Sequence, residues 1–405
     1  MRLLIHDYAG HPFQVQLSRA LAARGHEVTH AYASSIQTPR GALTRRDDDP
    51  AGFQIAGIGL SEPFQKHSFV KRRFQEVEYG RLIADKAEEL APDWVVSGNT
   101  PTEAQSILLD RCKKAGVPFA YWVQDFYGIA VHKLLSKKIP VVGAAVGGYY
   151  KWLDRKALRA SDRVIVITDD FVPLMNDMSI GGDQLEVIEN WAPLEEMPVR
   201  DRDNAWSEEH DLSDKFCYLY SGTLGMKHNP QLLLDLAVAY RDDPAVRVVV
   251  VSEGIGIDWL EQQRDDLGLD NLVLLPFQPF ERLPDVLGSA DVLIAILEPD
   301  AGVFSVPSKV LTYLCAGRAL LTAIPASNLA ARIVERCKAG LVVAPEDHAA
   351  FLEAARTLHD NRELREACGR CAREYSEQTF DIDRITDRFD ALLAEQSAPA
   401  AAPAP

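Results

Sequence analysis

Residues 218–227 read YLYSGTLGMK, an apolar run followed by a glycine-rich turn and a lysine. The run predicts a strand, and Gly222 and Gly225 predict a turn that lets a ligand approach the backbone closely. Lys227 falls at the start of the next helical pattern, where backbone amides and an ammonium can bind an anion together. The stretch therefore indicates an α/β unit with a phosphate site, and the same pattern also fits a plain strand-to-helix turn with an exposed lysine.

A second stretch of this kind is AGVFSVPSKVLTYLCAG at 301–317. Pro307 suits the first turn of a helix, where its missing N–H would have no partner. The next amides, of Ser308 and Lys309, would then point out of the helix start toward a phosphate. Ser308 also fits the commoner role of a helix cap. The loop 8–11 is a third candidate, because Gly10 leaves its backbone accessible.

Short apolar strands alternate with amphipathic helices along most of the chain, which indicates parallel sheets covered on both faces. Segment 190–215 is charged, shows neither period, and is interpreted as a linker with a short surface segment. We expect an α/β protein of two facing Rossmann-like domains, 1–195 and 196–380, followed by a helix and a low-complexity Ala/Pro tail at 381–405. Ligands of such sheets bind beyond the carboxyl ends of the strands, so the site is expected in the cleft between the domains. The expected strands are 2–5, 27–33, 94–96, 119–123, 163–167, 185–188, 216–221, 246–252, 272–275, 292–296 and 320–323.

Composition limits the class of protein. The 405 residues are 47% hydrophobic and 25% charged, as in ordinary globular chains. The net charge of −16 argues against a nucleic-acid-binding surface. No apolar run approaches the ~20 residues that span a bilayer, and the N-terminus is unlike a signal peptide. Six scattered cysteines suggest a reducing compartment, so we expect a cytoplasmic protein, and the CxxC at 368–371 is a poor zinc motif.

Basic residues are concentrated in 61–160, which holds 16 Lys and Arg against 11 Asp and Glu, a local net charge of +5. Aromatic residues lie among these charges. Such a pattern suits an anionic membrane surface or a lipid diphosphate, and it also fits solvated helix faces. The two clusters are Phe64, Lys66, Phe69, Lys71, Arg72, Arg73 and Phe74, and then Lys133, Lys137, Lys138, Tyr149, Tyr150, Lys151 and Trp152.

In their order along the chain, these segments resemble the retaining glycosyltransferases of family 4, which have the GT-B fold. The resemblance rests on LSRALAARGHEV at 17–28, VIENWAP at 187–193, YSGTLGMKHNPQLLL at 220–234, VVVVSEGIG at 248–256 and PSKVLTYLCAG at 307–317. It implies transfer of a hexosyl or N-acetylhexosaminyl group from a nucleoside-diphosphate sugar. The PSK form resembles members that build bacterial surface polysaccharides, which implies a lipid-linked or polysaccharide-precursor acceptor.

The resemblance also implies roles for particular residues. Lys227 would stabilise the leaving diphosphate, and Asp125 would act near the sugar or, equally, cap the segment that follows it. The two glutamates usual in the family correspond here to Phe304 and Thr312. No metal or other cofactor is expected. The implied donor site consists of Gly222, Thr223, Lys227, Glu253, Pro307, Ser308, Lys309 and Thr312, and the implied acceptor or phosphate loop contains Gly10 and His11.

Three alternatives stay open. A sugar-nucleotide epimerase of the same fold would need acid and base groups that converge on the sugar. A non-catalytic nucleotide-sugar-binding protein would be compatible with the two replaced glutamates. An NAD-dependent oxidoreductase would need GxGxxG after a strand, and Gly10 stands alone in its loop, so this alternative is poor.

Overall fold

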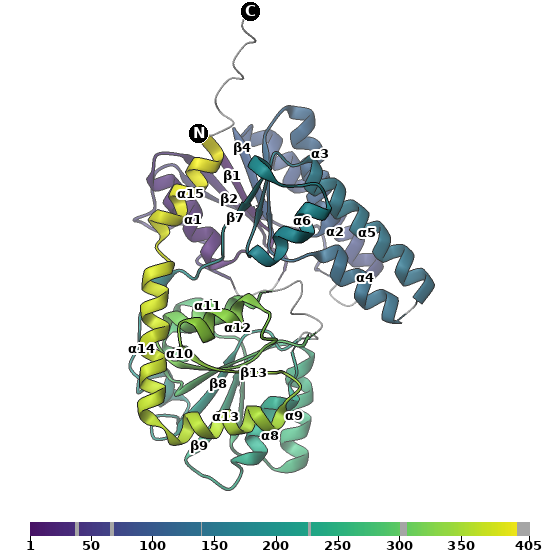
Figure 1. Cartoon of the computed structure of the whole chain (residues 1–405). Coiled ribbons are helices and arrows are strands. Elements are labelled where there is room, and N and C mark those ends of the chain that lie inside the picture. The colour runs from purple at the N-terminus through teal and green to yellow at the C-terminus, as the bar shows by residue number, and fades with distance from the viewer. Residues whose placement is uncertain (37–39, 65–68, 139, 226–227, 300–305, 395–405) are drawn as a thin grey trace, which may run out of the picture. The chain divides into compact units, whose positions relative to one another are not determined.

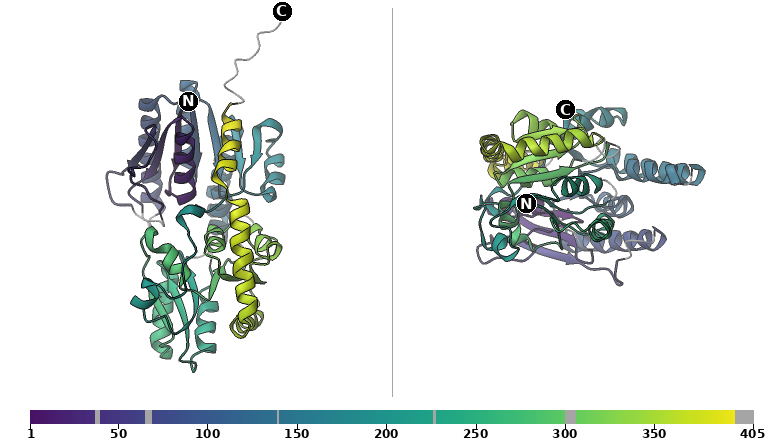
Figure 2. Two further views of the ribbon diagram at one scale, coloured as in Figure 1. Left: turned by 90° about the vertical axis from the view of Figure 1, so that its left-hand side faces the viewer. Right: turned by 90° about the horizontal axis from the view of Figure 1, so that it is seen from below.

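The computed structural model describes residues 1–36, 40–64, 69–138, 140–225, 228–299 and 306–394. The chain forms two compact units, one of Met1–Glu189 with the segment from Asp381 onward, the other of Asn190–Phe380 (Figure 1). The division falls between Glu189 and Asn190, where the sequence suggested 195 and 196. Each unit is a parallel sheet with helices on both faces, which confirms the predicted α/β class (Figures 1 and 2).

The first unit contains a seven-stranded sheet in the order β3-β2-β1-β4-β5-β6-β7. The central strands are apolar on both faces because helices cover both sides. Strand β3 was not predicted, because its sequence, FQIAGI, is short and half-buried and lacks a regular pattern. The strands are Arg2–Asp7, Glu27–Ala33, Phe53–Ile58, Trp94–Gly98, Phe119–Val123, Arg163–Val166 and Leu185–Val187; the helices are α1 Pro12–Ala23, α2 Phe69–Leu90, α3 Thr102–Ala115, α4 Tyr127–Lys138, α5 Pro140–Ala160, α6 Val172–Asp177 and α15 Ile382–Ala394.

The second unit contains a six-stranded sheet in the order β10-β9-β8-β11-β12-β13. Its core is a cluster of buried Val, Leu, Ile and Tyr side chains from the central strands and the helices that cover them. The strands are Phe216–Ser221 (β8), Val246–Val251 (β9), Leu272–Leu275 (β10), Val292–Ile296 (β11), Ala319–Ala323 (β12) and Gly340–Val343 (β13); the helices are α7 Ala205–Glu209, α8 Gln231–Ala239, α9 Ile255–Leu267, α10 Leu283–Gly288, α11 Ser308–Cys315, α12 Leu329–Arg336, α13 His348–Asp360 and α14 Arg362–Thr379.

The long helices α4 and α5 lie side by side and extend away from the sheet of the first unit (Figures 1 and 2). Gly143 and Gly147 on α5 make the close packing feasible. A Cβ at Gly143 would lie 2.1 Å from the carbonyl oxygen of Leu135, and one at Gly147 would lie 2.4 Å from the Cα of His132. None of the helices in the described ranges combines the length and the apolar character needed to cross a bilayer.

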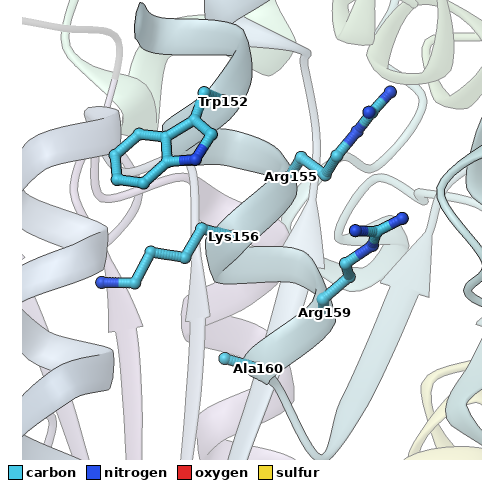
Figure 3. Close-up of a pocket in the computed structure, with 5 residues that line it drawn as sticks. All are labelled: Trp152, Arg155, Lys156, Arg159 and Ala160. Atoms are coloured by element: carbon cyan, nitrogen blue, oxygen red, sulfur yellow. The ribbon is translucent and has the colours of Figure 1, made fainter.

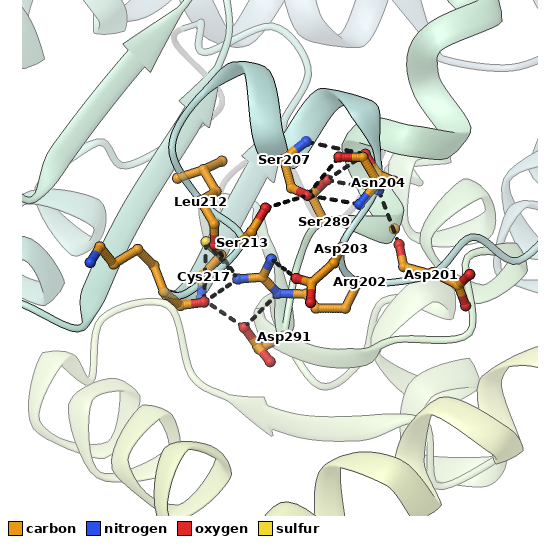
Figure 4. Close-up of polar contacts among 12 residues, drawn as sticks. Asp201, Arg202, Asp203, Asn204, Ser207, Leu212, Ser213, Cys217, Ser289 and Asp291 are labelled. Carbon is orange, nitrogen blue, oxygen red and sulfur yellow. Dashed lines mark hydrogen bonds and ion pairs between the residues drawn. The ribbon is translucent and has the colours of Figure 1, made fainter.

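Segment 190–215 is more ordered than the predicted linker. Trp206 on α7 is fully buried, and Asn204 caps this helix through a capping box with Ser207. Arg202 binds Asp291 at 3.1 Å and the carbonyl oxygens of Leu212 and Lys215, which attaches the segment to the sheet of the second unit (Figure 4). The prediction of a mere surface segment is therefore wrong. The polar residues of segment 190–215 form hydrogen bonds with one another and with residues next to the start of β8 and β11.

Candidate functional site

The candidate donor residues of the second unit gather at the carboxyl ends of β8, β9 and β11. From β8 the chain adds β9 and β10 on one side of the sheet and then β11, β12 and β13 on the other side. The order of the strands therefore changes direction between β8 and β11. Parallel sheets bind ligands at such a switch point. Gly222 and Thr223 follow β8, and Glu253 follows β9 with an exposed side chain.

The loop after β8 is held by hydrogen bonds in a fixed conformation. Gly222 has a φ of +132°, which other residues rarely adopt, and its N–H donates to Val251 at 3.0 Å. The hydroxyl of Tyr220 donates to the carbonyl of Thr223 at 2.9 Å, and the amide of Leu224 donates to the carbonyl of Glu253 at 3.2 Å. The loop is therefore pre-formed, with the Thr223 side chain exposed.

Lys309 projects from α11 over this loop. Its Nζ lies 3.6 Å from the centre of the Tyr220 ring and 3.1 Å from the position a Cβ would take at Gly222. The atom is buried and has no hydrogen-bond partner in the described part of the chain. Burial lowers the pKa of Lys309 well below its usual value. A buried ammonium without a partner is costly, so this arrangement suits an anionic ligand.

The start of α11 differs in detail from the prediction. Pro307 occupies the cap position, and no side chain caps the helix, so the alternative in which Ser308 caps it is wrong. Ser308 is exposed as the first helical residue, and Thr312 lies half-buried one turn later. The hydroxyl of Tyr313 bonds both the N–H and the carbonyl of Ser221, at 2.8 and 2.9 Å, and thereby fixes α11 beside β8. Lys227 and Phe304 lie outside the described residues.

The first unit has a polar group at its own switch point, between β1 and β4. Gly10 lies in the turn after β1, and its amide donates to the carbonyl of Asp7 at 3.2 Å. His11 follows, with its Nδ1 3.2 Å from Asp7. The sequence interpretation overlooked Asp7 and Asn99. The four-residue spacing of Asp7 and His11 was the signal in the sequence that could have revealed this pair. Asn99 gave no such signal, because it follows β4 and lies far from Asp7 in the sequence.

Asp125 lies just beyond β5, with an exposed side chain. Its carboxylate raises the pKa of His11, although β4 lies between the two strands, β1 and β5, that these residues follow. The amide of Gly128 at the start of α4 instead donates to Asp154, at 2.7 Å. The structure thus places the charge of Asp125 within electrostatic range of His11.

The basic residues of 61–160 fall into two groups. Arg72 and Arg73 bind the buried carboxylates of Glu76 and Glu103, each at 2.7 Å, while 36% and 49% of their side chains stay exposed. On α5, by contrast, Trp152 is 57% exposed, and Figure 3 shows basic side chains on both sides of the helix. These residues line a cavity of about 390 Å³: Trp152, Arg155, Lys156, Arg159 and Ala160. Lys66 lies outside the described residues.

Two family models match almost the whole chain. A glycosyl transferase 4-like domain matches residues 11–191, and a glycosyl transferases group 1 domain matches residues 202–375. The chain belongs to the GT-B glycosyltransferases of the family 4 type. This glycosyltransferase is 26% identical over 285 residues to WcaI of Escherichia coli K12, which is named for colanic acid biosynthesis; the match covers 68% of each chain.

Solved structures share the fold of this glycosyltransferase. Sucrose-phosphate synthase from Thermosynechococcus elongatus superposes with a TM-score of 0.72 at 14% identity, covering 99% of this chain and 100% of the other. HepE of Anabaena in complex with UDP-glucose gives 0.68 at 14% identity, covering 98% and 100%. WaaG, a glycosyltransferase involved in lipopolysaccharide biosynthesis, gives 0.67 at 16% identity, covering 96% and 99%. These likenesses confirm the two-domain GT-B fold.

Proposed function

We propose that this glycosyltransferase is a retaining enzyme that moves a hexosyl or N-acetylhexosaminyl group from a nucleoside-diphosphate sugar to a lipid-linked or polysaccharide-precursor acceptor. WcaI and WaaG, which carry names from polysaccharide and lipopolysaccharide synthesis, support the class of acceptor. The complex of HepE with UDP-glucose supports a nucleotide sugar as donor. The work would take place in the cytoplasm, where nucleotide sugars are made.

The observation that carries this proposal is the Nζ of Lys309, which lies over the Tyr220 ring and has no hydrogen-bond partner among the residues that the structure describes. A diphosphate placed beyond Gly222 would supply the anionic partner that the ammonium lacks. The start of α11 adds the positive end of a helix at the same place. Because a leaving nucleoside diphosphate gains charge as the glycosidic bond breaks, these groups would stabilise the transition state.

In this proposal, protein cations and helix amides neutralise the diphosphate, with Lys227 as a second cation, and no metal is needed. Transfer should therefore continue at an unchanged rate in EDTA. A loss of activity that Mg²⁺ or Mn²⁺ restores would contradict the metal-independent part of the proposal.

Lys309→Met tests the donor site, since it removes the charge and keeps the length of the side chain. We expect a UDP-, GDP- or TDP-sugar from a panel to raise the Tm of the wild type. The variant should bind this donor at least 10-fold more weakly in calorimetry and lose about 10²–10³ in kcat for nucleotide release with a lipid extract. Lys215→Met is the control, because the ammonium of Lys215 forms an ion pair with the exposed Asp214, 2.9 Å away, outside the candidate donor site. Equal donor affinity in the Lys309 variant would remove Lys309 from the site, and an epimerised donor would favour the epimerase.

We also propose that α5 docks on an anionic lipid surface. Val141 is 85% exposed and Trp152 57%, and Lys151 and Arg155 lie one turn apart beside Trp152. Each basic residue near such a surface contributes about 1 kcal/mol, whereas the acidic remainder of the chain is screened beyond about 8–10 Å. A lipid-linked acceptor would reach the first unit from this surface.

Liposome flotation tests the docking proposal. The wild type should float with anionic but not with zwitterionic vesicles at low salt, and should dissociate in ~0.5 M salt. Lys151→Ser/Arg155→Ser should weaken binding to anionic vesicles about 10-fold or more, while Arg362→Ser/Arg370→Ser on α14 should leave it unchanged. A wild type that stays in the soluble fraction with anionic vesicles at low salt would favour a soluble acceptor.

A further inference from the structure

Asp7 at the end of β1 is the centre of a buried hydrogen-bond cluster. Its side chain is inaccessible to solvent, and both oxygens lie 3.2 Å from the Nδ1 of His11. The backbone amides of Ala9, at 3.1 Å, and of His11 donate to the same carboxylate. Asp7 is therefore held by its own turn, before any side chain from elsewhere contributes.

Two more residues fix this carboxylate from other elements. Asn99, beyond β4, donates to Asp7 at 3.4 Å and has a φ of +52°, which costs energy for a residue other than glycine. Gln14 on α1, with its amide nitrogen turned toward Asp7, donates at 2.8 and 3.0 Å. Burial raises the pKa of Asp7, but the contacts with His11 outweigh burial, and the pKa falls to about 2. Asp7 is thus an anion at any physiological pH.

The contacts of Nδ1 bear on which nitrogen of His11 carries the proton. Nδ1 lies 3.2 Å from both oxygens of Asp7 and 3.2 Å from the amide nitrogen of Asn99. Because both carboxylate oxygens only accept hydrogen bonds, they favour a proton on Nδ1, which then donates to Asp7. Nε2 is then left as the basic atom, and it makes no hydrogen bond within the described residues. The side chain of His11 is 29% exposed, so this nitrogen is accessible from the strand ends.

We propose that His11 is a catalytic residue whose Nε2 removes the proton of the acceptor hydroxyl, and that Asp7 is the positioning residue that orients His11 and stabilises its charged form. This inference rests on the proposed glycosyl transfer. The cluster is more elaborate than a turn requires: Gln14 on α1 and Asn99 beyond β4 converge on a buried carboxylate, and the partly exposed His11 is its titratable neighbour.

The proposed step balances as follows. The O–H bond of the acceptor breaks, and its proton moves to Nε2, which gives an imidazolium next to the Asp7 anion. The acceptor oxygen forms a bond to the anomeric carbon of the donor on the same face from which the nucleoside diphosphate leaves, so that the configuration is retained. The bond from that carbon to the β-phosphate oxygen breaks, and its electron pair leaves with the nucleoside diphosphate. The imidazolium then loses the proton to water.

The charged groups around His11 predict the pH dependence. Burial lowers the pKa of His11, but the carboxylates of Asp7 and Asp125 raise it by more, so that the pKa of His11 lies above its usual value. His30 on β2 faces Asp7 and, like His6 on β1, is buried with a lowered pKa, to about 4 and about 3. These two rings stay neutral near pH 7. The rate should therefore rise with pH through the pKa of His11 and then level off.

Kinetics of three variants test the assignment, with nucleotide release from the donor that the panel selects and a lipid extract as the source of acceptor. His11→Gln should lower kcat about 100-fold or more, leave donor Kd within about 2-fold, and abolish the acidic limb of the pH profile. Asp7→Asn should lower kcat about 10-fold and move that limb to lower pH. His26→Gln, whose ring binds Asp390, is the control and should behave as wild type.

Two outcomes would overturn the inference. One is an unchanged kcat in His11→Gln, and the other is an acidic limb of the pH profile that does not move in Asp7→Asn. If Asp7→Asn fails to fold, ¹⁵N NMR of histidines in the wild type decides the positioning role, because it reports which ring nitrogen of His11 is protonated at high pH. A proton on Nε2 would refute it. A wild type that releases no nucleotide from any donor removes the proposed function itself, while the NMR result still tests the Asp7–His11 pair.

Discussion

Buried ionisable side chains determine much of the local chemistry of this glycosyltransferase. Asp154 on α5 is an example outside the candidate sites. Its carboxylate accepts hydrogen bonds from Thr102 at 2.8 Å and from the amide of Gly128 at 2.7 Å, and so joins α3, α4 and α5. Burial raises its pKa from 3.8 to about 6, although both hydrogen bonds act in the opposite direction. In the folded protein, Asp154 therefore stays protonated up to a pH of about 6, where the free side chain is already ionised.

This shift predicts how stability depends on pH. Between pH 4 and 6 the folded protein binds a proton at Asp154 that the unfolded chain has lost, so stability falls as pH rises. A shift of about two units corresponds to about 2–3 kcal/mol. In Asp154→Asn an amide can accept from Gly128 and donate to Thr102. We expect the difference in unfolding free energy, variant minus wild type, to rise by that amount from pH 4 to pH 7 in urea titrations. A constant difference would show that the folded pKa is not raised.

Among the secondary-structure elements, the α4–α5 pair depends on glycines at one helix face. Gly143 and Gly147 are buried against α4, while the adjacent Gly148 has no atom within 4 Å of the position of a Cβ. Glycine is otherwise unfavourable in a helix interior, by about 1 kcal/mol relative to alanine. The close approach of α4 thus explains why residues 143 and 147 are glycine. Gly148, which faces open space on the same helix, is a matched control for both positions.

Gly147→Ala and Gly148→Ala should therefore change stability in opposite directions. At Gly147 the new methyl group would overlap His132 and force α4 and α5 apart, at a cost of about 1–3 kcal/mol. At Gly148 the methyl group meets open space and should stabilise the helix by about 0.5–1 kcal/mol. Urea unfolding followed by circular dichroism measures both. Equal effects of the two substitutions would contradict the packing of α5 on α4.

On the scale of the whole molecule, the chain returns at its C-terminal end to the unit in which it began. Helix α15 belongs to the first unit, where the fully buried Phe389 lies 5.0 Å from the ring of Trp122. Arg24 binds Asp387 at 2.7 Å and Asp390 at 2.8 Å. The first unit is therefore complete only when residues from both ends of the sequence are present.

Phe389→Ala should destabilise the first unit by about 3–5 kcal/mol, because it leaves a cavity beside Trp122. Hydrogen exchange should show faster opening of β1, β4 and β5, with protection of β8 and β9 unchanged. Asp387→Asn is the control: Asp387 is largely exposed, and an exposed ion pair contributes at most about 1 kcal/mol. Faster exchange spread equally over both units would show that α15 does not belong to the first unit alone.

The sequence by itself determined the α/β class, the two parallel sheets, most strand positions and the family, because buried parallel strands are short apolar runs and turns need glycine in fixed places. It also pointed to Lys309, since Pro-Ser-Lys begins a helix. Only the tertiary structure decided which charges are free. Lys309 and Arg72 are both basic residues in the first turn of a helix, yet the Nζ of Lys309 is buried with no hydrogen-bond partner among the described residues, whereas Arg72 binds Glu76. Asp7 and its partner Asn99 are far apart in the sequence, and they meet because β1 pairs with β4 in the sheet.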